Sequence, residues 1–227
     1  MSIVKPMSLN RPLDLRKSLG LCFLTAQWLL VAPTAPAADS PALSIKATGV
    51  TGTARYEDKN HPGWTDLHPG DALIGYPVLQ TNLKDSTADI ELVGPDARGP
   101  VWVRMFSNTL LREVRLNPTP SRSTKRTGIL LDVAAGQIRI SLNGASDYAF
   151  TLVRSDSGTR VTVPQTNANP NQIAFVFDGS LTVLKGTIQA SVGGGREKLI
   201  HAGEQLRRGA SEVTKTPPEA PELRLDQ

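Results

Sequence analysis

The chain alternates apolar and polar residues over short stretches that glycine- and proline-rich turns separate. Three stretches share one sequence pattern, in which a tight glycine turn joins two apolar strands. They occupy residues 129–144, 175–186 and 199–209. A period of two predicts half-buried β-strands, and glycine permits turns that a Cβ atom would block. We therefore predict an all-β domain, a wrapped or solenoid-like stack of short strands with an irregular repeat.

The same alternation predicts which side chains share a face of a strand. Residues 43–57 alternate around Gly49 and Gly52, which indicates one edge strand with a bend. Residues 108–114 also fit a short helix, but their β-branched and aromatic content favours a strand. Two further sets are each expected on one face of a strand, and three apolar residues flank Gly136: Ala88, Ile90 and Leu92; Val101, Val103 and Met105; and Val133, Ile138 and Ile140.

The N-terminal residues 1–37 are typical of a secretory signal peptide. A positively charged region precedes an apolar stretch at 21–32, and Ala35 and Ala37 occupy the −3 and −1 positions of a cleavage site. A transmembrane anchor is the alternative, but this stretch is shorter than the roughly 20 residues that span a bilayer. We expect N-terminal sequencing of the exported protein to show cleavage after Ala37 or, alternatively, after Ala38.

Removal of the signal peptide would take away most of the net charge of +4. Residues 1–37 hold four basic side chains and one acidic side chain, so the remaining chain is left near +1. That balance gives no support to nucleic-acid binding. The lone cysteine, Cys22, lies within the apolar stretch after Leu21, which is too large for a lipoprotein site, so no disulfide is expected after cleavage.

Composition divides the rest of the chain into three parts. Residues 38–44 form a short leader, residues 45–208 the β domain, and residues 209–227 a Pro- and Glu-rich tail expected to be disordered. Within the turn-rich part of the domain, Trp64 and Leu67 are expected to be core anchors.

A polar loop at residues 117–128 carries the basic residues Arg122, Lys125 and Arg126. Such a loop is usually solvated. The alternative is an anion or partner contact, because loops often carry binding residues. These three residues are therefore the candidate partner-binding site.

Five sequence phrases in order resemble the FecR domain. "GWTDLHPGDALIGYPVLQT" is similar to the W-x-x-L-x-x-G-x-x-L-x-x-G…T segment of that family, and "ADIELVGPDARGPVWVRMFSNTLL" to its A-x-I-x-L…T-x-L segment. "LLDVAAGQIRISL", "FVFDGSLTV" and "LIHAGEQLRRG" resemble its glycine-turn phrases. The resemblance covers roughly residues 46–208.

The resemblance implies a wrapped, all-β domain outside the cytoplasmic membrane. The best-known FecR proteins receive a signal from an outer-membrane TonB-dependent receptor and control a membrane-spanning anti-sigma regulator. This chain shows no cytoplasmic regulatory segment, no retained transmembrane helix and only a displaced G-T-x-F segment at 157–163. We therefore expect a stand-alone exported module rather than direct control of a sigma factor.

The sequence shows no reaction centre. The three histidines, His61, His68 and His201, lack the spacing of a zinc site. Gly193–Gly195 indicates a hairpin rather than a phosphate loop, and Ser180 a turn residue rather than a nucleophile. Neither an enzyme nor a bound metal or cofactor is expected.

Two groups of residues offer alternative functions. Glu57 and Asp58 could serve glycoside hydrolysis, but adjacent strand residues point to opposite faces. Trp64, Tyr76 and Trp102 could form a sugar-stacking platform, although aromatic residues of this kind are more often core anchors.

We expect an exported, non-catalytic interaction or sensing module of the bacterial cell envelope that binds a protein partner. Transmembrane signalling is one process in which such binding would serve. The alternative is a carbohydrate-binding or structural envelope module. Exposed aromatics on one face would favour sugar, whereas a bare strand edge or the basic loop would favour protein. A partner strand is expected at a terminal edge, where Thr51→Pro would block it.

Overall fold

The computed structural model describes only residues of the second of two units, 1–38 and 39–227, into which the chain divides. The described residues are 43–82, 84–94, 99–118, 127–143, 149–154, 158–163, 172–191, 195–208, 210 and 212–217. The predicted signal peptide, most of the leader, and Arg122, Lys125 and Arg126 lie outside these residues.

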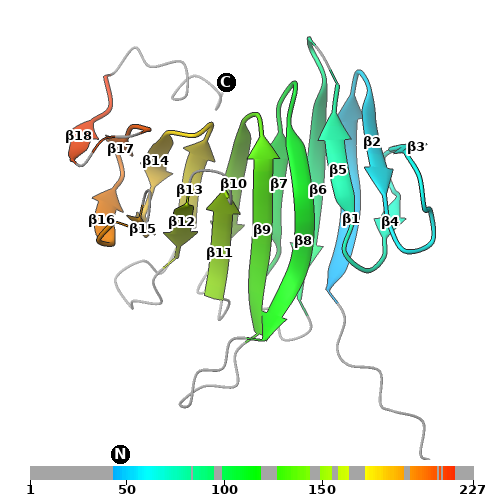
Figure 1. Cartoon of the computed structure of the whole chain (residues 1–227), viewed down its shortest axis with the longest axis horizontal. Coiled ribbons are helices and arrows are strands. Elements are labelled where there is room, and N and C mark those ends of the chain that lie inside the picture. Colours follow the sequence, from blue (N-terminus) through cyan, green and yellow to red (C-terminus); the bar gives the residue numbers. More distant parts are fainter. Residues whose placement is uncertain are drawn as a thin grey trace, which may run out of the picture. The chain divides into compact units, whose positions relative to one another are not determined.

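The described residues form an all-β fold of two nine-stranded sheets, as the alternating pattern predicts (Figure 1). Sheet A contains β1 (Ser44–Thr51), β4 (Ala72–Leu73), β6 (Thr87–Val93), β7 (Val101–Met105), β10 (Ile138–Asn143), β13 (Gln172–Phe177), β14 (Leu181–Lys185), β17 (Glu204–Leu206) and β18 (Val213–Lys215). Sheet B contains β2 (Ala54–Glu57), β3 (Thr65–Asp66), β5 (Val78–Thr81), β8 (Leu110–Pro118), β9 (Thr127–Ala135), β11 (Ala149–Arg154), β12 (Thr159–Thr162), β15 (Thr187–Ser191) and β16 (Lys198–His201). In this part of the chain, a helix that could span a membrane is not found.

Both sheets follow the chain from one end to the other. Sheet A runs in the order β4-β1-β6-β7-β10-β13-β14-β17-β18, and sheet B in the order β3-β2-β5-β8-β9-β11-β12-β15-β16. The chain therefore passes repeatedly from one sheet to the other as it advances. Among the described strand pairs only β9 and β11 are parallel. They lie parallel because the intervening strand, β10, returns through the opposite sheet.

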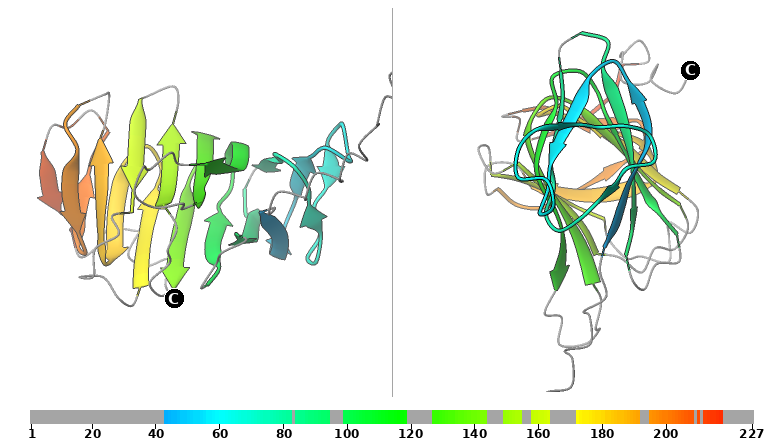
Figure 2. Two further views of the ribbon diagram at one scale, coloured as in Figure 1. Left: turned by 90° about the horizontal axis from the view of Figure 1, so that it is seen from below. Right: turned by 90° about the vertical axis from the view of Figure 1, so that its right-hand side faces the viewer.

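One hydrophobic core lies between the sheets, which face each other in the right-hand view of Figure 2. It contains side chains from both sheets, including the fully buried Phe175 and Phe177 of sheet A and Leu79 of sheet B. The apolar residues between Ala88 and Ile140 that the sequence places on shared faces or beside Gly136 are each at most 1% exposed. The period-two pattern is thus the direct cause of the two-layer packing.

The repeated glycine turns connect strands in two different ways. Around Gly136 and Gly203, two-residue turns carry the chain from sheet B to sheet A. Around Gly179, a three-residue turn closes the β13–β14 hairpin within sheet A. The Ser180 amide donates to Asp178 Oδ1 at 2.8 Å there, which confirms the prediction that Ser180 is a turn residue.

Threonine side chains link successive turns at the corners between the sheets. The Thr109 amide donates to Thr81 Oγ1 at 3.0 Å, and Thr109 Oγ1 donates to the Gln137 carbonyl at 2.9 Å. Both threonines are fully buried. Backbone groups that the strand ladders leave unpaired at these corners therefore find partners in the interior, as buried polar groups must.

Three sequence predictions need correction. Trp64 is 47% exposed and is not a core anchor, whereas Leu67 is 3% exposed and is one. Residues 43–57 form two strands in different sheets rather than one bent strand, because the chain turns at Gly52 between β1 and β2. Within the predicted disordered tail, Val213–Lys215 form β18, which pairs with β17.

The edge of the first strand is also less open than predicted. The short strands β4 and β3, both from residues 58–77, pair with β1 and β2 respectively. The alternation alone did not reveal these strands, because each contains only two residues.

A buried carboxylate organises this covering segment. Asp58, whose side chain is 1% exposed, accepts hydrogen bonds from the His61 ring at 2.9 Å and from the Ile74 amide at 3.0 Å. It also accepts from the amides of Asn60 and His61. Burial by itself would raise the pKa of Asp58, but these hydrogen bonds outweigh burial and lower its pKa below the ordinary 3.8. The ionised form is thus the one that folding favours.

Asp58→Asn is therefore expected to lower the free energy of unfolding by about 2–3 kcal/mol at neutral pH. Because the pKa is lowered by folding, the stability that the carboxylate contributes is complete above its unfolded pKa and is lost as the pH falls through the folded pKa. Urea unfolding should show the gap between wild type and variant narrowing as the pH is lowered from neutral to below the ordinary pKa of 3.8. A gap that stays constant over this range would contradict the assignment.

Candidate functional site

The outward face of sheet A brings residues from three neighbouring strands, β6, β7 and β10, into two rows. Across the first row, Asp89 of β6 lies opposite Arg104 of β7, which lies opposite Arg139 of β10. In the second row, Trp102 of β7 lies opposite Ser141 of β10. These positions alternate with the buried residues of the same strands, so the strand period that fills the core also exposes this set.

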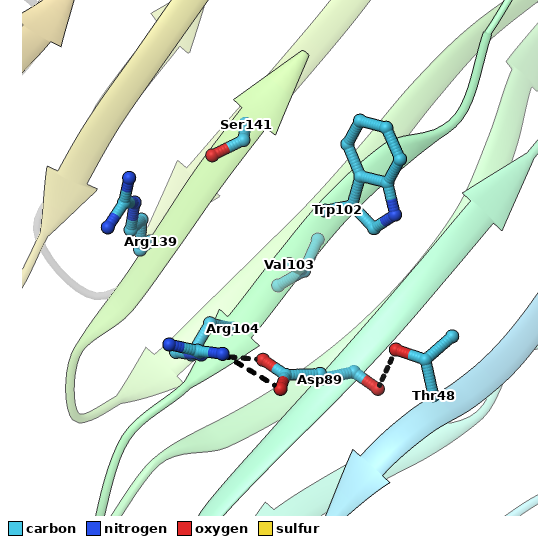
Figure 3. A pocket seen from close by; sticks show the side chains of 7 residues that line it. All are labelled: Thr48, Asp89, Trp102, Val103, Arg104, Arg139 and Ser141. Atoms are coloured by element: carbon cyan, nitrogen blue, oxygen red, sulfur yellow. Dashed lines mark hydrogen bonds and ion pairs between the residues drawn. The ribbon is translucent and has the colours of Figure 1, made fainter. Parts of the chain in front are cut away.

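The rows border a shallow hollow of about 440 Å³ (Figure 3). It is lined by the following residues: Thr48, Asp89, Trp102, Val103, Arg104, Arg139 and Ser141. Its lining combines one indole, two guanidinium groups, one carboxylate and two hydroxyls. Such a surface can accept a ligand that has an apolar group beside hydrogen-bonding groups.

An ion pair with two hydrogen bonds joins Asp89 and Arg104, which both line the hollow. Arg104 Nε donates to Asp89 Oδ1 at 2.7 Å, and Arg104 Nη2 donates to Asp89 Oδ2 at 3.0 Å. Hydrogen bonding to Asp89 raises the pKa of Arg104 above its ordinary value. On the other side, Thr48 Oγ1 donates to the Asp89 carbonyl at 3.2 Å. This arrangement fixes the guanidinium plane before any ligand arrives, which limits the ordering cost of binding.

Large exposed apolar side chains form a second group of candidates. Among the described residues these are Trp64, Ile74, Tyr76 and Leu199. The first three lie in or beside the segment that supplies β3 and β4, and Leu199 lies in β16. They therefore belong to the two ends of the sheets rather than to the hollow.

The structure separates the aromatic residues that were grouped as a sugar platform. Trp64 precedes β3 at the edge of sheet B, whereas Trp102 lies on β7 within sheet A. Tyr76 is 67% exposed. Trp64 and Tyr76 are thus exposed, so the expectation that they are core anchors is wrong, but the three aromatic residues do not come from one sheet.

The other sequence candidates remain apart. Asp58 is buried, and its carboxylate accepts hydrogen bonds from the His61 ring and the Ile74 amide, whereas Glu57 is only partly buried. Within the described part of the chain, no group of three or more His, Cys, Asp or Glu could hold a metal ion. The basic loop lies outside the described residues, so its role stays a prediction.

Sequence reasoning missed the pairing of Asp89 with Arg104. Both residues occupy polar positions of strands that were correctly predicted, but the register between the strands decides that they meet. The short connection between these strands was a usable signal, because sequential antiparallel strands are usually neighbours.

Comparison with known proteins finds no matching family, no matching curated protein and no matching solved structure.

Proposed function

We propose that the protein is an exported, non-catalytic binding module of the bacterial cell envelope, periplasmic or secreted, which holds a protein partner against the hollow of sheet A. The observation that carries this proposal is the placement of Trp102 beside the prearranged Asp89–Arg104 pair. Tryptophan and arginine are the residue types most enriched where protein interfaces concentrate their binding energy. A protein side chain or strand would cover Trp102 and shield the ion pair from water.

We further propose that the domain has the wrapped, FecR-like architecture that its sequence phrases resemble. Repeated passage of the chain between two sheets supports this proposal, and so does the parallel pairing of β9 with β11 around β10. The stacked threonine corners add support, because they join one layer to the next. A role in transmembrane signalling would require that partner binding at the hollow alter the partner's own contacts.

Carbohydrate is the second candidate for the same hollow. The indole of Trp102 could stack on a sugar ring while Ser141, Thr48 and the guanidinium groups bind hydroxyls. The separation of Trp64 from Trp102 favours the protein partner, since an extended sugar chain would need aromatic residues along one face.

The test compares Trp102→Ala with Trp64→Ala, a matched removal of indole at another place. Each purified protein is immobilised and exposed to a detergent extract of the native envelope, and the retained material is analysed before and after protease digestion. We expect a retained protein, other than further copies of this chain, whose affinity falls at least about 30-fold for Trp102→Ala and little for Trp64→Ala. Retention of protease-resistant glycan would favour the second candidate, and equal retention by all three proteins would reject the hollow as the site.

A further inference from the structure

The two ends of the sheets share features that the faces between them lack. At the first end, β3 and β4 are the outermost strands, and at the second end the outermost strands are β16 and β18 (Figure 1). An outermost strand directs part of its backbone N–H and C=O groups away from its single neighbour, which makes it a template for another strand. The four large exposed apolar side chains of the described residues lie in or beside these end segments.

Trp64 and Leu199, one from each end, belong to the same face of the same sheet. Trp64 adjoins β3, in which Thr65 lies opposite the buried Tyr56, so Trp64 falls on the outward face of sheet B. In β16, Ile200 is buried and Leu199 is 56% exposed, which places Leu199 on that face as well. If sheet B continued from one copy into the next, Trp64 and Leu199 would come to lie on neighbouring strands.

The charges of the ends are opposite. Segment 58–77 contains three acidic residues and one basic residue, for a net charge of −2. It remains negative when Arg55, which pairs with Asp66 at 3.2 Å, is included. The end formed by residues 195–208 and 212–217 contains five basic and three acidic residues, for a net charge of +2. Unlike ends therefore attract, whereas like ends repel.

We propose that copies of this protein associate head to tail, with the β3/β4 end of one copy against the β16/β18 end of the next. Trp64 and Leu199 supply apolar contact, the opposite charges set the orientation, and backbone pairing between edge strands extends the sheets. Because the two surfaces differ, the contact is heterologous and leaves an open end on every assembly. The hollow opens on the outward face of sheet A, from β1 to β10, rather than on the outermost strand β4, and stays available to its partner.

Sedimentation of the purified protein between about 1 µM and about 1 mM tests the proposal. We expect average mass to rise with protein concentration and to fall when salt is added, because salt screens the opposite charges. Trp64→Ala and Leu199→Lys should each weaken self-association at least about tenfold. Arg115→Ala, on an exposed mid-sheet position of β8, is the control and should leave it unchanged.

A mixture of the two variants distinguishes unlike ends from like ends. Each variant keeps one intact end, so the mixture should form a dimer of one Trp64→Ala copy with one Leu199→Lys copy and nothing larger. Circular dichroism and thermal melting verify that both variants are folded. Monomeric wild type at every concentration would overturn the proposal. So would a self-paired dimer that one variant abolishes and the other leaves intact, because that pattern means association through like ends.

Discussion

Gly136→Ala is expected to lower the free energy of unfolding by about 2–5 kcal/mol, which combines the cost of a left-handed backbone with that of overpacking. Gly136 has a φ of +85°, and a Cβ atom there would stand 2.4 Å from Thr109 Cα and 2.5 Å from the Asn108 carbonyl oxygen. Backbone atoms cannot yield as the end of a flexible side chain can. The substitution should therefore separate two stacked turns, with Thr109 and its hydrogen bonds to Gln137 at the centre.

Gly203→Ala is the matched control. Gly203 also turns the chain from sheet B to sheet A and has a φ of +80°, but a Cβ atom would meet nothing within 4 Å. Only the backbone cost remains, about 1–2 kcal/mol. Urea unfolding of both variants measures the difference. Equal losses would show that Gly136 is required for its backbone angle alone and that the corners are not tightly stacked.

Leu67→Ala should also cost about 2–5 kcal/mol, as expected when a buried leucine leaves a cavity. Leu67 is 3% exposed, packs with the main core, and donates its amide to the Ala54 carbonyl at 2.9 Å. It therefore anchors the segment that supplies β3 and β4 to the body of the sheets. Thermal unfolding followed by circular dichroism would measure the loss.

Trp64→Ala in the same segment provides the contrast. Because Trp64 is 47% exposed, its removal should change stability by no more than about 0.5 kcal/mol. A loss as large as that for Leu67→Ala would mean that Trp64 packs against the core after all.

The period-two pattern predicted the longer strands and which of their residues share a face, but not the short strands β3 and β4. Val101, Val103 and Met105, which were expected on one face, are all buried, because a strand with one apolar face can bury only that face. Residues 108–114 lie mainly in β8, so the strand prediction was right and the helical alternative wrong. The pattern could not reveal that the turn at Gly136 changes sheet while the turn at Gly179 does not, since both read as glycine between apolar runs.

The candidate site in sheet A could not be predicted from the sequence of any one strand. Arg104 and Asp89 read as ordinary polar residues on outward faces, and only the register of β6 with β7 brings them together. Trp64 was misjudged for a related reason. Its side chain and that of Leu67 are both large and apolar, and the direction in which the short strand β3 faces decides which of them reaches the core.

Photo-cross-linking from the hollow tests the central claim most directly. A photoreactive phenylalanine analogue in place of Ser141 would stand beside Trp102 and Arg139, and the same analogue in place of Arg115 would stand on sheet B. After illumination of intact cells, we expect a discrete cross-linked protein from position 141 only, which disappears when Trp102→Ala is added. Cross-linking from position 115 alone, or a product from position 141 that persists without Trp102, would contradict a partner site in the hollow.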